Sequence, residues 1–242
     1  MAELLLEILS EEIPARMQAK ASDDLKCLVT DALKDSGLEC SRARAYATPR
    51  RLTLVIEGLP ARSPNVKGER KGPKTNAPEQ AVAGFRRSLP EGVAIEERET
   101  PKGNVFFATW EEAGRDTREV LAECLPGALR GLPWPKSMRW ATHDMRWVRP
   151  IQSLIALFDG VPVAFEFGAV TSGEETRGHR FLAGDTFAVS DFADYKAKLM
   201  DAKVMLDPAA RRKLIATKAA KLAQAEDLTL KDDPALLNEV MG

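Results

Sequence analysis

The sequence is poor in the residues that build covalent or metal-held frameworks. It has only three cysteines, Cys27, Cys40 and Cys124, which are odd in number and lack Cys-x-x-Cys spacing. They support neither a disulfide framework nor a zinc site. Its two histidines, His143 and His179, have no partners at metal-ligand spacing. We therefore expect no metal site and a reducing, cytoplasmic setting.

The sequence also lacks the signals of export, membrane insertion and nucleophilic catalysis. The N-terminus has no basic region, and acidic residues interrupt its apolar stretch, which excludes a secretory signal. No apolar run approaches the ~18 residues of a membrane span, so we expect no membrane partner. Neither a Gly-x-Ser-x-Gly motif nor a Cys–His pattern is present. We therefore predict no catalytic residue in this chain.

Net charge is small, but charge is unevenly distributed. The formal net charge is −1. Residues 42–74 hold nine Arg or Lys against two Glu, a balance of +7, whereas residues 91–123 hold nine Asp or Glu against four Arg or Lys, a balance of −5. The whole molecule is not basic enough to attract nucleic acid, so any such binding depends on local groups of cations.

Apolar periodicity predicts an α+β fold. Residues 4–9 form an apolar run typical of a buried strand, residues 15–38 have apolar positions at helical spacing, and residues 51–58 are β-branched. Together they indicate a β-α-β unit. Hairpins are predicted at 94–99 with 105–112 and at 151–158 with 161–167, and helices at 79–88 and 115–129.

We predict two modules with mixed or antiparallel sheets packed by helices. The first is an α+β module at residues 1–132, and the second, at residues 133–242, has a helical end. Within that end, residues 192–225 form one or two helices, with Asp207 as an N-cap at a break. Residues 60–78 are rich in Pro, Gly, Asn and cations and are expected to form a mobile basic loop.

One glycine-rich segment is close to a phosphate-binding loop. Residues 68–75 differ from Gly-x-x-x-x-Gly-Lys-[Ser/Thr] by Pro73, which stands where the second glycine belongs. Proline offers neither the N–H group nor the dihedral angles that such a loop needs, and no strand is predicted before it. We therefore predict no nucleotide-binding loop here.

Two arginines follow a proline at the start of a predicted strand. Pro49 fixes the entry, and the adjacent Arg50 and Arg51 point to opposite faces. A guanidinium can donate two hydrogen bonds at once to a phosphate, which makes these residues candidate anion contacts. The alternative is an internal ion pair with a nearby carboxylate such as Glu11 or Glu12.

Two segments combine cations with tryptophan. Residues 136–140 include Arg139 beside Trp140, and residues 145–150 include Arg146 beside Trp147. This mixture suits RNA, whose bases stack on aromatic and guanidinium faces. The alternative is cation–π packing inside the fold.

A third cationic segment spans residues 175–181. Gly178 permits a turn with positive φ that would aim Arg177, His179 and Arg180 outward. The alternative is that Glu174 and Glu175 neutralise these cations locally.

Taken in order, these motifs resemble the N-terminal part of the β subunit of the bacterial two-subunit glycyl-tRNA synthetase. The similarity covers essentially the whole chain. It is carried by residues 4–14, by Ala47-Thr48-Pro49-Arg50-Arg51-Leu52, by Lys71-Gly72-Pro73, by residues 136–140, by Val148-Arg149-Pro150, and by Thr176-Arg177-Gly178-His179-Arg180-Phe181.

The resemblance implies a place in an α2β2 glycine–tRNA ligase and an α+β fold similar to the B3/B4 region of phenylalanyl-tRNA synthetase. It implies that the α subunit makes glycyl-adenylate from glycine, ATP and Mg²⁺, while the β subunit serves tRNA(Gly) binding and assembly. No cofactor is expected in this part, which is expected to be inactive alone. Family members continue into an HD-type and an anticodon-binding domain, and the uncapped apolar residues 236–242 also indicate a chain that continues.

The expected partners are therefore the α subunit and tRNA(Gly), and not DNA. The candidate tRNA contacts are Arg50, Arg51, Lys71, Lys74, Arg139, Arg146, Arg177 and Arg180. The rival hypothesis is a structural module in which the arginines form internal ion pairs that hold β against α or against the further domains. Residual editing, by analogy with the B3/B4 region, has no residue-level support.

Overall fold

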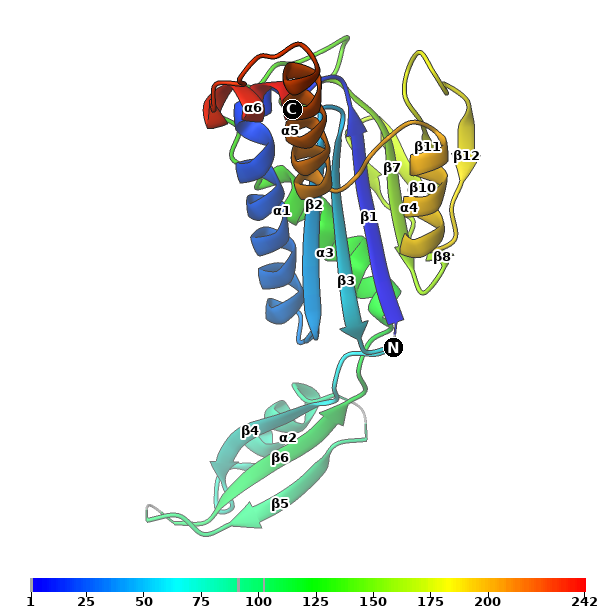
Figure 1. Ribbon diagram of the computed structural model, residues 1–242. Coiled ribbons are helices and arrows are strands. Elements are labelled where there is room, and N and C mark those ends of the chain that lie inside the picture. Colours follow the sequence, from blue (N-terminus) through cyan, green and yellow to red (C-terminus); the bar gives the residue numbers. More distant parts are fainter. Residues whose placement is uncertain (1, 91, 102) are drawn as a thin grey trace. The chain divides into compact units, whose positions relative to one another are not determined.

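The computed structural model describes residues 2–90, 92–101 and 103–242, and these residues form two compact units (Figure 1). Unit 1 is the chain up to Ala61 together with the chain from Asp116 onward, and unit 2 is Arg62–Arg115. The predicted boundary between residues 132 and 133 lies inside unit 1, where strands from both sides of it share one sheet. As a boundary between folding modules it stays a prediction.

Unit 1 is built on a mixed sheet with the order β2-β3-β1-β7-β10-β9, and β8 pairs with β7. β1 is antiparallel to both β3 and β7, and β2 is antiparallel to β3. β1 and β2 are therefore parallel with β3 between them, which is a split β-α-β unit. The strands are β1 Ala2–Ser10, β2 Arg42–Thr48, β3 Arg51–Leu59, β7 Ile151–Phe158, β8 Val161–Pro162, β9 Glu166–Phe167 and β10 Val170–Gly173.

Helices cover both faces of this sheet. One face carries α1 and α3 and the other carries α4 (Figure 1). Successive side chains of β1 alternate between the two cores: Leu4 and Leu6 pack with α1 and α3, while Leu5 packs with α4. Because both faces are covered, β1 is apolar along most of its length. The helices are α1 Ala15–Asp35, α3 Thr117–Arg130 and α4 Phe192–Asp201.

The last part of unit 1 contains a short hairpin and two further helices. β11 (Glu175–Arg177) pairs antiparallel with β12 (Thr186–Ala188). α5 (Pro208–Ala225) begins at Asp207, whose carboxylate accepts hydrogen bonds from the amides of Ala209 and Ala210. This confirms the predicted break between two helices. α6 (Pro234–Met241) follows, and neither α5 nor α6 has a fully buried residue.

Unit 2 is a three-stranded antiparallel sheet with one helix. Its strand order is β4-β6-β5, which confirms the predicted hairpin of β5 and β6 and the short helix α2. The predicted mobile loop is wrong over β4, because that segment pairs with β6. The elements are β4 Val66–Lys74, α2 Glu79–Arg87, β5 Ala94–Arg98 and β6 Val105–Glu112.

Glycine explains why β4 was not predicted. The Trp110 ring lies against Gly68, and the Phe85 ring would meet a Cβ at Gly72 at 2.5 Å. The glycines of β4 thus leave space for aromatic rings from β6 and α2, and β4 has few apolar side chains of its own. Periodicity in apolar residues, the signal for a strand, is absent for that reason.

The fold class is α+β with mixed and antiparallel sheets, as predicted. The predicted β-α-β unit is wrong in its second strand, because β3 is antiparallel to β1 and the parallel strand is β2. The predicted hairpin of 151–158 with 161–167 holds only for β8, since β9 pairs with β10. The turn of the β7–β8 hairpin is Asp159-Gly160, with φ of 50° and 77°. No helix among the described residues is long and apolar enough to cross a membrane. Within the same residues, no group of three or more His, Cys, Asp or Glu is placed to hold a metal ion.

A candidate anion-binding pocket

Two of the cationic segments, far apart in sequence, meet at one pocket of unit 1. The pocket has a volume of about 300 Å³ and is lined by Thr48–Arg51, by Gly178–Phe181, by Lys203–Met205, and by Glu12 and Arg211. It therefore combines the turn between β2 and β3, the loop after β11, and the segment that leads into α5.

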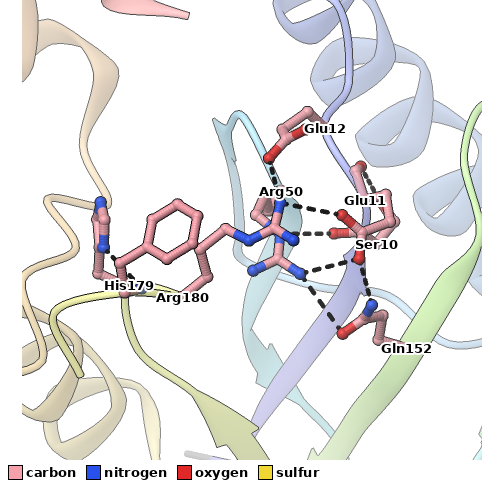
Figure 2. A network of polar contacts seen from close by, with 8 residues as sticks. Ser10, Glu11, Glu12, Arg50, Gln152, His179 and Arg180 are labelled. Atoms are coloured by element: carbon pink, nitrogen blue, oxygen red, sulfur yellow. Dashed lines mark hydrogen bonds and ion pairs between the residues drawn. The ribbon is translucent and has the colours of Figure 1, made fainter. Parts of the chain in front are cut away.

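The turn between β2 and β3 is held by the segment that follows β1. The Pro49 carbonyl accepts a hydrogen bond from the amide of Ile13 at 2.6 Å, and the Arg50 carbonyl accepts one from the amide of Ser10 at 2.8 Å. These bonds fix the backbone from which Arg50 extends. They also place the carboxylates of Glu11 and Glu12 close to the guanidinium groups of Arg50 and Arg180 (Figure 2).

Arg50 and Arg180 converge on those carboxylates (Figure 2). Arg50 Nη2 lies 3.3 Å from Glu11 Oε1, and its Nε donates to the Ser10 carbonyl at 3.3 Å. Arg180 Nη1 lies 2.8 Å from Glu12 Oε1 and 3.5 Å from Glu11 Oε2. The alternative proposed for Arg50, an internal ion pair, is the one observed. Partly exposed pairs of this kind stabilise a fold by about 0–1 kcal/mol each.

Arg51 points the other way, into the core beneath α4. Its Nε lies 3.0 Å from Glu7 Oε2, and its Nη2 donates to the Arg177 carbonyl. The Arg51 and Glu7 side chains are 4% and 0% exposed. Arg51 thus presents almost no surface to an external ligand. Its ion pair with Glu7 is buried, so removal of either partner would leave an uncompensated charge in the core.

Hydroxyl groups complete the surroundings of Glu7. The Thr176 and Tyr195 hydroxyls both donate to the Glu7 carboxylate, and the Tyr195 oxygen lies 2.8 Å from Thr53 Oγ1. Burial, together with the negative charge of Glu7, raises the pKa of Tyr195 well above its ordinary value. Tyr195 therefore remains a neutral donor to Glu7 at physiological pH.

The loop after β11 is shaped by close packing at Gly178. A Cβ at this position would meet the Ala183 carbonyl oxygen and the Ala202 Cβ, both at 2.5 Å. The expectation of a positive φ here is wrong, because Gly178 is not among the residues with positive φ. His179 Nδ1 accepts hydrogen bonds from the amides of Phe181 and Leu182, each at 3.3 Å. A neutral His179 therefore carries its proton on Nε2.

Sequence reasoning missed two of the pocket's cations, Lys203 and Arg211. Arg211 donates to the carbonyls of Met205, Leu206 and Ala47 at 2.7, 3.0 and 2.9 Å, which ties the start of α5 to β2. Burial lowers the pKa of Arg211. Neither cation lies in a motif with a proline, glycine or aromatic neighbour, so no sequence signal marked them.

Other predicted contacts lie outside this pocket. Lys71 and Lys74 are exposed on β4 of unit 2. Arg139 directly follows Met138 and Arg146 directly precedes Trp147, the two residues that form a bridge, and Arg177 lies on β11. These five cations are exposed, and none forms an ion pair with a carboxylate among the described residues.

The two tryptophans beside Arg139 and Arg146 differ in burial. Trp147 is 1% exposed and packs edge-on against Trp134 and Phe167, with ring centroids 5.1 and 5.4 Å away. It belongs to the core and offers no stacking surface to RNA. Trp140 is half-buried, 6.1 Å from the His143 ring.

Comparisons with known proteins give one consistent result. A family model described as glycyl-tRNA synthetase beta subunit matches residues 4–242. Similar curated proteins, each named glycine–tRNA ligase beta subunit, come from Rhodospirillum centenum at 47% identity, Ruegeria sp. at 51% and Paracoccus denitrificans at 50%. The alignments cover 100% of this chain but 38%, 36% and 36% of those proteins. The chain thus spans little more than a third of the length of these relatives.

Proposed function

The chain belongs to the glycyl-tRNA synthetase β-subunit family, and from this premise we propose that it serves as the N-terminal part of such a subunit. In this role it supports the binding of tRNA(Gly) and the assembly of a cytoplasmic α2β2 glycine–tRNA ligase. The α subunit carries out the adenylate chemistry with ATP and Mg²⁺. This chain alone is inactive and takes part in glycylation only within the assembled enzyme.

The observation that carries the RNA-binding part of the proposal is the set of exposed cations without carboxylate partners. A cation that already pairs with a carboxylate has less to offer a phosphate, whereas an exposed unpaired one can replace a counterion on the RNA backbone. The residues proposed to contact tRNA are Lys71, Lys74, Arg139, Arg146 and Arg177.

A second function is favoured by the remaining arginines. Arg50, Arg51 and Arg180 form ion pairs with Glu11, Glu7 and Glu12 inside unit 1. We assign them a scaffold role, which holds the loop after β11 against β1 and β3. Among the eight cations predicted from the sequence, these three support the structural hypothesis and the other five support the RNA hypothesis.

Salt-dependent titration with tRNA tests the assignment. The chain is titrated with tRNA(Gly) and with an unrelated tRNA across a salt series. Each phosphate contact contributes about 0.7–0.9 to the slope of log K against log salt. We expect Arg139→Gln, Arg146→Gln or Arg177→Gln each to weaken binding modestly and to lower the slope by about 0.7–1.

The matched control is Lys20→Gln, which removes one exposed charge on α1 where Lys20 already pairs with Asp24. We expect this variant to leave the slope unchanged. If all three arginine variants behave like the control, the contacts assigned to these arginines are wrong. If the unmodified chain does not bind tRNA even at low salt, the RNA-binding role fails and the scaffold role remains.

A further inference from the structure

The charges around the pocket are not balanced. The three arginines of its sequence motifs are paired with Glu7, Glu11 and Glu12. Lys203 and Arg211 also line the pocket, and no carboxylate among the described residues forms an ion pair with either. Asp207 lies nearby, but its carboxylate caps α5. Asp207 opposes the charge of Arg211 without forming an ion pair with it, and in the described part of the chain no carboxylate forms an ion pair with Lys203. The pocket therefore keeps cations that no ion pair within these residues neutralises.

Arg211 has donors left over. A guanidinium has five N–H groups, and three hydrogen bonds from Arg211 go to backbone carbonyls. Its Nε is buried and has no hydrogen-bond partner among the described residues. That atom is not accessible from the pocket, but the three bonds use both N–H groups of Nη1 and only one of Nη2. The second N–H of Nη2 is therefore left to donate to an anion in the pocket. Lys203 is exposed at the same pocket and can approach the same anion.

The pocket lining also has an apolar and aromatic part. Phe181 is 82% exposed although it is a large hydrophobic residue, and Pro49, Val204 and Met205 also line the pocket. The Arg180 guanidinium lies 5.2 Å from the centroid of the Phe181 ring. An exposed ring backed by a guanidinium is the kind of surface on which a nucleobase stacks. His179 Nε2, which carries the proton of the neutral ring, is a further donor.

We propose that this pocket binds a nucleotide, with its phosphate at Lys203 and Arg211 and its base on Phe181. The proposal deepens the proposed RNA-binding function and rests on it for the source of the nucleotide, a residue of an RNA strand. A free mononucleotide has the same chemistry and is the other possible source. An acidic peptide would satisfy the cations equally well but would leave the exposed aromatic ring without a role.

Calorimetric titration of the chain at low salt tests the proposal with AMP, inorganic phosphate and adenosine. We expect AMP to bind more tightly than phosphate, and phosphate more tightly than adenosine. Tri-adenylate, added as a fourth probe, distinguishes the sources: tighter binding than AMP indicates an RNA strand, and weaker binding indicates a free nucleotide. Either result supports the pocket.

The first variant tests the phosphate side. Lys203 has φ of 64°, a conformation in which asparagine is favoured, so Lys203→Asn removes the charge without backbone strain. We expect it to weaken AMP and phosphate binding about tenfold, the effect of losing one charge-assisted hydrogen bond. Lys231→Asn removes the same charge from an exposed loop outside the pocket and should change neither affinity.

The second variant tests the base side. Phe181→Ala removes an exposed ring and is therefore expected to leave the fold intact. It should weaken AMP binding about five- to tenfold through lost stacking while leaving phosphate binding unchanged. Leu182→Ala, at an exposed neighbour that does not line the pocket, is the matched control.

Three results would overturn the proposal. The first is that the chain does not bind AMP, the second is that each variant changes the affinity no more than its control does, and the third is that the chain binds a glutamate-rich peptide and not AMP. Binding of AMP by a chain that fails to bind tRNA would keep the pocket and remove the RNA-binding function. The two proposals can therefore fail separately.

Discussion

Glu7 and Arg51 form an ion pair in the interior of unit 1, on strands that neighbour each other in the sheet. Sequence reasoning placed Arg51 among candidate RNA contacts because a planar guanidinium can donate two hydrogen bonds at once to a phosphate. It could not show which of two adjacent arginines faces the core. Which arginine faces the core depends on tertiary packing, because Glu7 is held there by a hydrogen bond from the Tyr195 hydroxyl of α4. Tyr195 lies far from Arg51 in the sequence, so no local pattern reveals this contact.

The two adjacent arginines allow a matched test of this difference. Arg51→Met leaves the Glu7 charge buried without a partner, and we expect it to lower the free energy of unfolding by about 3–5 kcal/mol. Arg50→Met removes a partly exposed pair, and about 1 kcal/mol or less is expected. Urea denaturation measures both.

A double variant checks that the large effect comes from the uncompensated charge. Glu7→Gln combined with Arg51→Met should be more stable than Arg51→Met alone, because the buried charge is gone. Equal losses for the Arg50 and Arg51 variants would contradict the buried ion pair.

At the scale of elements, the loop after β11 shows what a motif can reveal and what it cannot. The sequence marked Gly178 as special, and the structure confirms that only glycine fits there. The reason differed from the prediction: the constraint is the approach of Ala183 and Ala202, not a positive φ. Ala202 follows α4, and its contact with the loop depends on tertiary packing that no local pattern encodes.

Gly178→Ala tests that constraint. The added Cβ would meet a backbone carbonyl and another Cβ, neither of which can rotate away, so the loop must shift. We expect a loss of about 1–3 kcal/mol in the free energy of unfolding, typical of overpacking. Gly173→Ala is the control, since a Cβ there has no heavy atom within 4 Å. A loss at Gly173 as large as that at Gly178 would count against the packing argument.

The elements that sequence reasoning found share a strong local signal. α1, α3, α4 and α5 have helical apolar spacing or an aspartate cap, and the β5–β6 hairpin has turn residues between its two strands. β2 and β4 were missed because their stability comes from pairing with neighbours and not from apolar side chains of their own. In β4, glycine makes room for aromatic residues of other elements.

At the scale of the whole molecule, unit 2 is an insertion into unit 1. The chain leaves unit 1 after Ala61 and returns at Asp116. These ends are adjacent: the Thr117 amide donates to the Ala61 carbonyl at 3.0 Å, and the Thr117 hydroxyl donates to the Pro60 carbonyl at 2.6 Å. The sequence did not reveal this insertion. Its clearest change in composition is from the basic segment 42–74 to the acidic segment 91–123, and neither segment begins or ends at the borders of unit 2.

Excision of unit 2 tests its independence. We expect a chain in which a short Gly-Ser linker replaces residues 62–115 to keep the sheet of unit 1, because the ends of the gap are already bridged by hydrogen bonds. Thermal denaturation of the shortened chain, followed by circular dichroism, would then show a cooperative unfolding transition at the temperature at which unit 1 unfolds in the intact chain. Loss of cooperative unfolding in the shortened chain would show that unit 1 depends on the insertion.

The position of β1 has a consequence for synthesis on the ribosome. Among the strands of its sheet, β1 is made before the others, yet it lies between β3 and β7, and β7 ends only at Phe158. At about 5–20 residues per second, an apolar strand waits on the order of 10 s for its second neighbour. Unit 2 is continuous in sequence and can fold as it emerges. The inserted unit is thus expected to fold before the unit that surrounds it, and the exposed nascent β1 is the segment that chaperones would need to protect.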